Sequence, residues 1–198
     1  MGLSWIGLVN PWIPDSITFF IVLIIGEKLS LVQTFFIGYI PIPFFIMCWT
    51  IAVADFLMTE NKKWLVTIVA ITLVLAEILL IVFLFTNIDI LGYQVAPFQL
   101  RFGPYMIIYL FCAVIYALIT GILFSRKAMK SDIPKVTLMG KFLLAAFIFY
   151  GIGSVVEVTM QITPMTILIT KSILIMSAIC FYIGFLMPKR IQNRLLKI

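Results

Sequence analysis

Six long apolar blocks are the feature of this sequence that most constrains its fold. They occupy residues 3–26, 31–57, 64–86, 103–124, 138–159 and 163–187 of the 198-residue chain. Each of the last five is about 22–27 residues long, and a helix of about 20 residues crosses the hydrocarbon core of a bilayer. Apolar side chains occur all around each block, as expected for helices surrounded by lipid and by one another. The sequence therefore predicts an all-α fold, a polytopic transmembrane helix bundle with six spanning segments.

Composition argues against a soluble protein and excludes several kinds of chemistry. Apolar residues make up 64% of the chain and charged residues 11%, whereas soluble domains have about 45–50% and about 25%. The chain contains no histidine, which excludes imidazole bases and histidine ligands to metal or haem. Cys48, Cys112 and Cys180 each stand alone within an apolar block, so neither a zinc site nor a disulfide framework is expected. We therefore expect no catalytic residue, no metal and no cofactor.

Prolines interrupt the first two blocks. Pro11 and Pro14 break block one, and Asp15 or Ser16 can cap a second helical piece. We interpret this block as one discontinuous spanning segment; an interfacial N-terminus followed by a re-entrant half-helix is the alternative. Pro41 and Pro43 bend block two in the same way. Backbone carbonyls freed at these four prolines need partners, so the prolines mark either a cavity or plain structural kinks.

The distribution of basic residues predicts the orientation. With the C-terminus inside, residues 58–63, 125–137 and 188–198, together with Lys141, carry eleven lysines and arginines, whereas the outer connections carry only Lys28 and Arg101. This bias places the C-terminus in the cytoplasm of a multi-pass protein of the cell membrane. The net charge of +6 is explained by topology, and no nucleic-acid partner is expected. The longest outer connection, residues 87–102, is expected to be a loop.

The C-terminal tail differs from the rest of the chain. We expect residues 1–187 to form a single transmembrane bundle and residues 188–198 to form a basic interfacial tail. In that tail Ile191, Leu195 and Ile198 follow helical spacing, with Arg190, Arg194 and Lys197 on an adjoining face. The pattern predicts a short helix lying at the inner face and held by anionic lipid.

Ionisable residues inside the apolar blocks are the candidate site residues. Charges within a membrane usually face the bundle and pair with one another. Lys171 leans toward the outer surface and Glu157 toward the inner one, since side chains tilt toward a helix's N-terminus; we therefore predict that these two pair. Glu77 is then left as a buried acid, neutral and hydrogen-bonded or facing a cavity. A ligand or proton site is the alternative to a structural ion pair.

Small residues recur at every fourth position of block four. Ala113, Ala117 and Gly121 form a smooth face that lets a neighbouring helix approach closely. We predict that this is a helix-packing face within the bundle; an interface with a second copy of the chain is the alternative.

Short motifs follow one another along nearly the whole chain. They are Trp5 with Pro11-Trp12-Ile13-Pro14-Asp15-Ser16, Ile40-Pro41 with Trp49, Gly121-Ile122-Leu123-Phe124-Ser125-Arg126-Lys127, Lys130-Ser131-Asp132-Ile133-Pro134 with Gly140-Lys141-Phe142, and Phe181-Tyr182-Ile183-Gly184-Phe185 with Pro188. With this succession the chain resembles uncharacterised archaeal multi-span membrane proteins, which in turn resemble the seven-helix N-terminal sensor region of histidine kinases. The resemblance implies a receptor-like bundle, in which the six blocks are helices two to seven and a first helix preceding Met1 is missing.

These observations lead to a function without catalysis. We expect an integral membrane protein that acts as a sensor-like or partner-binding transmembrane module in signal transduction. A small transporter or channel-like protein and a structural subunit of a larger membrane complex are the alternatives. The expected partners are the lipid bilayer, anionic lipid at the inner face, and either another protein of the membrane or cytoplasm or a second copy of the chain.

Overall fold

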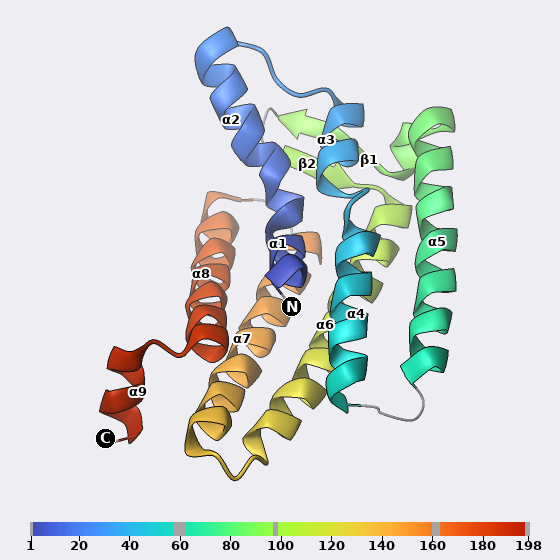
Figure 1. The fold of residues 1–198 in the computed structure, drawn as a ribbon. Coiled ribbons are helices and arrows are strands. Elements are labelled where there is room, and N and C mark those ends of the chain that lie inside the picture. Colours follow the sequence, from blue (N-terminus) through green and yellow to red (C-terminus); the bar gives the residue numbers. More distant parts are fainter. Residues whose placement is uncertain (1, 58–61, 97–98, 160–162, 197–198) are drawn as a thin grey trace. The chain divides into compact units, whose positions relative to one another are not determined.

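The computed structural model describes residues 2–57, 62–96, 99–159 and 163–196. The chain divides into two compact units, Met1–Tyr109 and Leu110–Ile198, each of which is described by itself (Figure 1). The single bundle expected for residues 1–187 stays a prediction. Lys197 and Ile198 of the expected amphipathic tail lie outside the described residues.

The helices confirm the predicted fold class. Six helical stretches of the described chain are long and apolar enough to cross a membrane: Ile6–Ile25, Leu31–Leu57, Lys62–Thr86, Pro104–Met129, Pro134–Thr159 and Met165–Leu186. Each coincides with one of the six apolar blocks. Many large apolar side chains on these helices are exposed, among them Leu23, Ile68, Ile108 and Ile175. In a membrane protein such side chains face lipid, which solvates them as well as a protein core does.

The first unit contains the broken segments. Its elements are α1 (Gly2–Val9), the 3₁₀ turn η1 (Asn10–Trp12), α2 (Ile13–Ile25), α3 (Leu31–Gly38), α4 (Ile42–Leu57), α5 (Lys62–Thr86), the 3₁₀ turn η2 (Ile88–Ile90), the strands β1 (Gly92–Ala96) and β2 (Gln99–Phe102), and the start of α6 (Pro104–Met129). Helix α4 packs against both α1 and α5, and α2 packs against α3. Figure 1 shows α4 and α5 running side by side in opposite directions.

The prolines lie where new helical pieces begin. Pro11 and Pro14 occupy the first turns of η1 and α2, and Pro43 lies in the first turn of α4. Pro41 lies in the turn that separates α3 from α4. At the first turn of a helix the missing N–H of proline would have no intrahelical partner in any case. The two predicted interruptions are thus present, and each divides its segment into separate helical pieces.

Asn10 joins the two interruptions. Its side-chain amide donates to the carbonyl of Gly38 at 2.7 Å and to that of Ile37 at 3.2 Å, at the end of α3. A Cβ atom added to Gly38 would lie 2.7 Å from Cγ of Pro14, so only glycine allows this approach. Because the carbonyls freed at the end of α3 have a protein donor, the contacts favour structural kinks over a cavity at the prolines.

The connection between α5 and α6 is more ordered than the sequence indicates. Instead of a loop, residues 87–102 contain η2 and an antiparallel hairpin in which Tyr93 faces Arg101 and Gly92 faces Phe102. The side chain of Leu91 is fully buried, and its carbonyl accepts from the amide of Gly103 at 2.8 Å. The ring of Phe102 meets that of Tyr39 edge to face, with centroids 5.7 Å apart. Strands of five and four residues are too short to give a clear alternating pattern.

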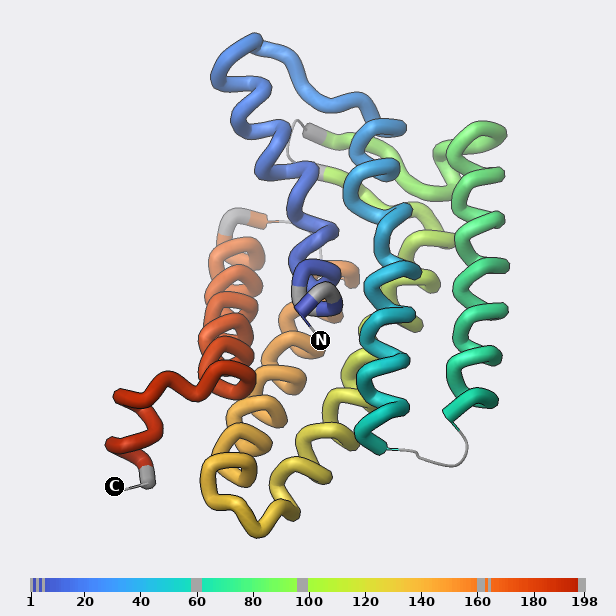
Figure 2. Tube along the Cα trace, in the orientation of Figure 1, coloured from blue at the N-terminus to red at the C-terminus, as the bar shows by residue number. Residues whose placement is uncertain are grey.

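The second unit is built on one tightly packed helix pair. It contains the rest of α6, α7 (Pro134–Thr159), α8 (Pro164–Leu186) and α9 (Lys189–Leu196). The hydroxyl of Ser177 on α8 donates to the carbonyl of Ala146 on α7 at 2.9 Å. The rings of Phe147 and Phe181 meet edge to face with centroids 4.8 Å apart. These contacts hold α7 and α8 side by side along their length (Figure 2).

Helix ends in this unit differ from the apolar block boundaries. Helix α6 continues five residues past Phe124 to Met129, and α7 begins at Pro134. The expected inner segment 125–137 is therefore mostly helical, and only four residues connect the two helices. Charged side chains such as Arg126 and Lys127 favour helix as strongly as most apolar ones do, so hydropathy alone places the end of the helix too early.

We predict that Asn10→Ala destabilises the protein by about 1–3 kcal/mol, because the carbonyls of Ile37 and Gly38 lose their buried donor. Thermal unfolding in detergent or lipid nanodiscs measures the effect. Asn87→Ala, the same change at an exposed position, is the control and should leave the unfolding temperature unchanged. Equal effects of the two substitutions would contradict the proposed role of Asn10.

Candidate functional site

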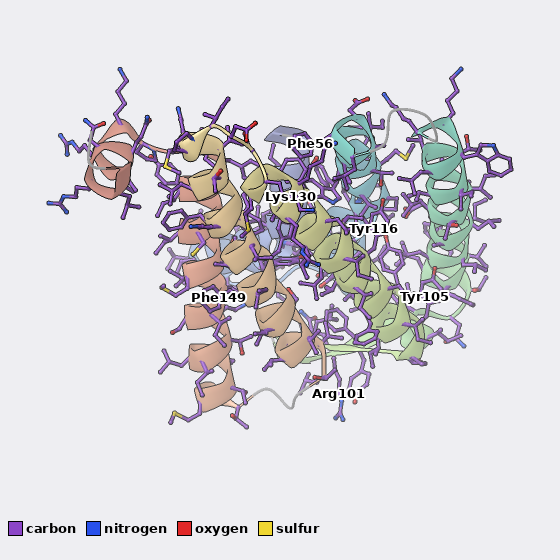
Figure 3. All side chains as sticks on the ribbon, turned by 90° about the horizontal axis from the view of Figure 1, so that it is seen from below. Phe56, Arg101, Tyr105, Tyr116, Lys130 and Phe149 are labelled. Carbon is purple, nitrogen blue, oxygen red and sulfur yellow. The ribbon has the colours of Figure 1, made fainter. Side chains whose placement is uncertain are left out.

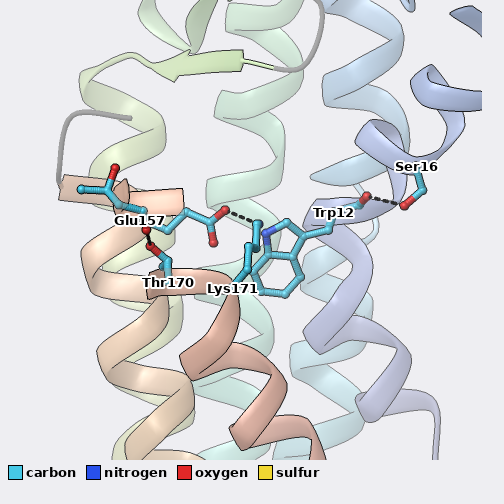
Figure 4. A network of polar contacts seen from close by, with 6 residues as sticks. Trp12, Ser16, Glu157, Thr170 and Lys171 are labelled. Atoms are coloured by element: carbon cyan, nitrogen blue, oxygen red, sulfur yellow. Dashed lines mark hydrogen bonds and ion pairs between the residues drawn. The ribbon is translucent and has the colours of Figure 1, made fainter. Parts of the chain in front are cut away.

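An ion pair links α7 and α8 in the second unit. Nζ of Lys171 lies 2.6 Å from Oε1 of Glu157, as the sequence leads us to expect. Figure 4 shows the two side chains reaching toward each other from neighbouring helices. Glu157 lies in the last turn of α7 and Lys171 two turns into α8. The long lysine stem spans the difference in level, and the pair leaves no net charge at this point of the helix pair.

The pair is only partly shielded. Its side chains are 27% exposed for Glu157 and 43% for Lys171. The preceding residue, Thr170, is buried and donates its hydroxyl to the carbonyl of Thr166, so the neighbouring polar group is satisfied within α8. A second ion pair, between Asp55 of α4 and Lys62 of α5, lies in the first unit and is more exposed. Both ion pairs thus join consecutive helices.

Glu77 occupies a different setting in the first unit. Both of its carboxylate oxygens are buried, and neither has a hydrogen-bond partner among the described residues. The phenols of Tyr105 and Tyr109, at the start of α6, are its neighbouring polar groups. Glu77 therefore belongs to the first unit, whereas the Glu157–Lys171 pair belongs to the second.

Two tyrosines and a phenylalanine line this part of α5 and α6. Tyr105 donates its hydroxyl to the carbonyl of Ala76 at 2.5 Å, directly beside Glu77 in the sequence. Its ring stacks on that of Tyr109 with centroids 6.2 Å apart and meets Phe83 edge to face at 5.2 Å. The hydroxyl of Tyr109 is buried and has no hydrogen-bond partner within the described chain. Figure 3 labels Tyr105 near one end of α6.

The tyrosines were not among the residues that the sequence singles out. The available signal was their spacing, because residues four apart lie on one face of a helix. Their proximity to Glu77 depends on how α5 and α6 meet, which hydropathy does not determine. The same holds for Asn10, whose partners at the end of α3 are 27 and 28 residues away in the chain.

The small-residue face of α6 is used for packing at Gly121. A Cβ atom at this position would lie 2.3 Å from the ring of Phe147 on α7, so only glycine permits the observed contact. Ala117 and Ala113, one and two turns earlier, are half-buried. The contact between Gly121 and Phe147 favours the packing interpretation over an interface with a second copy at this residue.

Basic side chains gather at one end of the second unit. Because α7 and α8 run side by side in opposite directions, the start of α7 lies beside the end of α8, which leads into α9. The exposed basic residues at this end are Arg126, Lys127, Lys130, Lys135, Lys189, Arg190 and Arg194. Figure 3 labels Lys130 in the turn between α6 and α7. We call these seven residues the basic end.

We predict a coupling of about 1 kcal/mol between Glu157 and Lys171, typical of polar contacts between helices in membranes. The measurement is a double-mutant cycle with Glu157→Gln and Lys171→Met, read out as unfolding in lipid–detergent mixtures. Each single substitution leaves one charge without its partner. The double variant should therefore be more stable than the sum of the two single effects predicts.

The matched control is the same cycle on Asp55 and Lys62, with Asp55→Asn and Lys62→Met. That pair is more exposed, so its coupling should be close to zero. A coupling between Glu157 and Lys171 no larger than that of the control would show that their contact contributes nothing to stability.

Comparison of the chain with protein-family models, with curated proteins and with solved structures finds no match. Functional inference for this integral membrane protein therefore rests on its own residues and their arrangement.

Proposed function

We propose that this protein is a sensor-like or partner-binding module of the cell membrane that acts without catalysing a reaction. The observation that carries the proposal is the basic end of the second unit. This end carries seven exposed basic side chains and one exposed acid, Asp132. They come from the end of α6, the start of α7 and α9, so a partner meets side chains fixed on three helices. The resemblance to sensor regions of histidine kinases supports the same function.

The basic end faces the cytoplasm in this proposal. The eleven-to-two bias of lysine and arginine between the two sides supports a cytoplasmic C-terminus, because short basic loops stay inside. A soluble protein with an acidic surface fits this end by charge, and opposite potentials accelerate and orient such encounters.

Anionic lipid is the second partner that we propose. Helix α9 carries Arg190 and Arg194 on one face and Ile191 and Leu195 on another. A helix of this kind lies in the interface, with its apolar side chains among the acyl chains and its basic ones among the headgroups. Basic residues near an anionic surface each contribute about 1 kcal/mol to binding.

The orientation predicts a labelling pattern in intact cells. In a chain whose three cysteines are replaced by serine, Lys130→Cys should react with a membrane-impermeant maleimide only after the cells are permeabilised. The control, Arg101→Cys at an exposed position of β2, should react in intact cells, because this residue belongs to the connection that we propose lies outside. Labelling of position 130 from outside would contradict the proposed orientation.

Photo-crosslinking tests whether a protein binds the basic end. We expect p-benzoylphenylalanine in place of Ile133, which is 59% exposed in the basic turn, to form a protein adduct in native membranes. Lys130→Glu with Lys135→Glu should abolish the adduct, because both remove positive charge beside the probe. The matched control, Lys28→Glu, changes an exposed lysine of an outer connection and should leave it intact. An adduct that persists without the basic residues, or lipid adducts alone, would refute the proposed function.

A further inference from the structure

Glu77 is a buried acid that belongs neither to the two ion pairs nor to the basic end. It lies nine residues before Thr86, the last residue of α5, which is about 13 Å along the helix axis. Its two carboxylate oxygens are buried and unpartnered among the described residues. The Glu77 side chain is thus deep in a membrane-spanning helix, with its polar atoms turned away from lipid.

Among the described residues of the first unit, no cation on the elements that pack against α5 compensates a charge at this position. Helix α5 packs against α4 and η2 and contacts the start of α6 through Tyr105. Within the described chain, the ionisable side chains that these elements carry are Cys48 and Asp55 on α4, Asp89 on η2, and Tyr105 and Tyr109 on α6. The nearest lysine on α5 itself, Lys63, is about 21 Å away along the helix axis. Arg101 on β2 is exposed.

The environment of Glu77 therefore suits a neutral group. An ionised carboxylate without a cation or hydrogen-bond donors is strongly unfavourable in an apolar interior, whereas a carboxylic acid is not. The Tyr109 hydroxyl, also buried and without a hydrogen-bond partner in the described chain, is the neighbouring neutral polar group. A protonated carboxyl and a phenol can each both donate and accept a hydrogen bond.

We propose that Glu77 is a proton-binding site in the membrane-spanning part of the first unit, with Tyr109 as its polar neighbour. The carboxyl holds a proton while α5 packs against the start of α6. Loss of that proton leaves a charge that must reach water or a cation, so proton release loosens the contact between α5 and α6. This site belongs to the first unit and does not depend on whether the basic end of the second unit binds a partner.

Dicyclohexylcarbodiimide tests the proposal, because it reacts with protonated carboxyl groups in apolar surroundings. The carboxyl proton passes to a carbodiimide nitrogen, the carboxyl oxygen adds to the central carbon, and the product rearranges to a stable acylurea. In the full chain reconstituted in lipid at neutral pH, peptide mass spectrometry should find the acylurea at Glu77. Glu77→Gln should abolish it, and Glu157→Gln, at an acid of the second unit that already pairs with Lys171, should change it by less than about twofold.

Two results would overturn the proposal. One is the absence of label at Glu77 while the folded chain is labelled elsewhere. The other is label that sodium or potassium ions suppress at constant pH, which would assign a metal cation to the site instead of a proton.

The pH dependence of thermal unfolding is an independent measurement. If the folded protein holds the proton more tightly than the unfolded chain does, the stability that Glu77 contributes is present at lower pH and is lost as pH rises. The carboxyl of the unfolded chain ionises at about pH 4.3, so above about pH 5 the unfolding temperature of the parent should fall with rising pH more than that of Glu77→Gln, until the folded protein has also released its proton. Glu77→Gln retains the neutral shape of the protonated acid, so it should fold. Parallel pH profiles of parent and variant would also refute the proton site.

Discussion

Backbone polar groups inside a bilayer need partners within the protein, and this constraint determines the architecture of the first unit. A continuous helix meets the constraint by itself, but this chain carries prolines in two consecutive spanning segments. The solution is to place the two interruptions against each other. Asn10 from η1 donates to the last carbonyls of α3, and Gly38 allows Pro14 to approach. The first broken segment thus supplies a hydrogen-bond donor for the second, and the second supplies the space that Pro14 of the first occupies. Neither segment is expected to be stable in lipid alone.

Two acids of the spanning helices also have partners within the protein, whereas a third, Glu77, has none among the described residues. The acids Asp55 and Glu157 each meet a lysine on the next helix in the chain, so that each consecutive helix pair is neutral at that point. Glu77 lies among aromatic rings without such a partner in the described chain. A chain that pairs Asp55 and Glu157 but leaves Glu77 beside a buried phenol has kept a polar group where an apolar one would pack more easily.

The sequence predicts the large features because they depend on few variables. Span lengths follow from bilayer thickness and hydropathy, and the Glu157–Lys171 contact follows from a short connection and the tilt of side chains along helices. The hairpin of residues 92–102 escapes prediction because its strands are short and its contacts, such as that of Phe102 with Tyr39, are made to a distant segment. The same limitation applies to Asn10 and to the two tyrosines near Glu77. Their roles depend on which helices touch, and a nearly uniform apolar surface carries little information about neighbours.

The abrupt end of α8 restricts how this helix can move relative to the membrane. Met187 has a left-handed backbone conformation, with φ of 39°, and Pro188 disfavours the helical region for the residue before it. The helix therefore stops here, and α9 starts in a new direction (Figure 2). If α9 lies in the lipid interface as proposed, sliding α8 along its axis would pull basic side chains into hydrocarbon or apolar ones into water. The second unit is then fixed in depth, and a signal passing through it would travel as rotation or tilt of the helices rather than as a piston stroke.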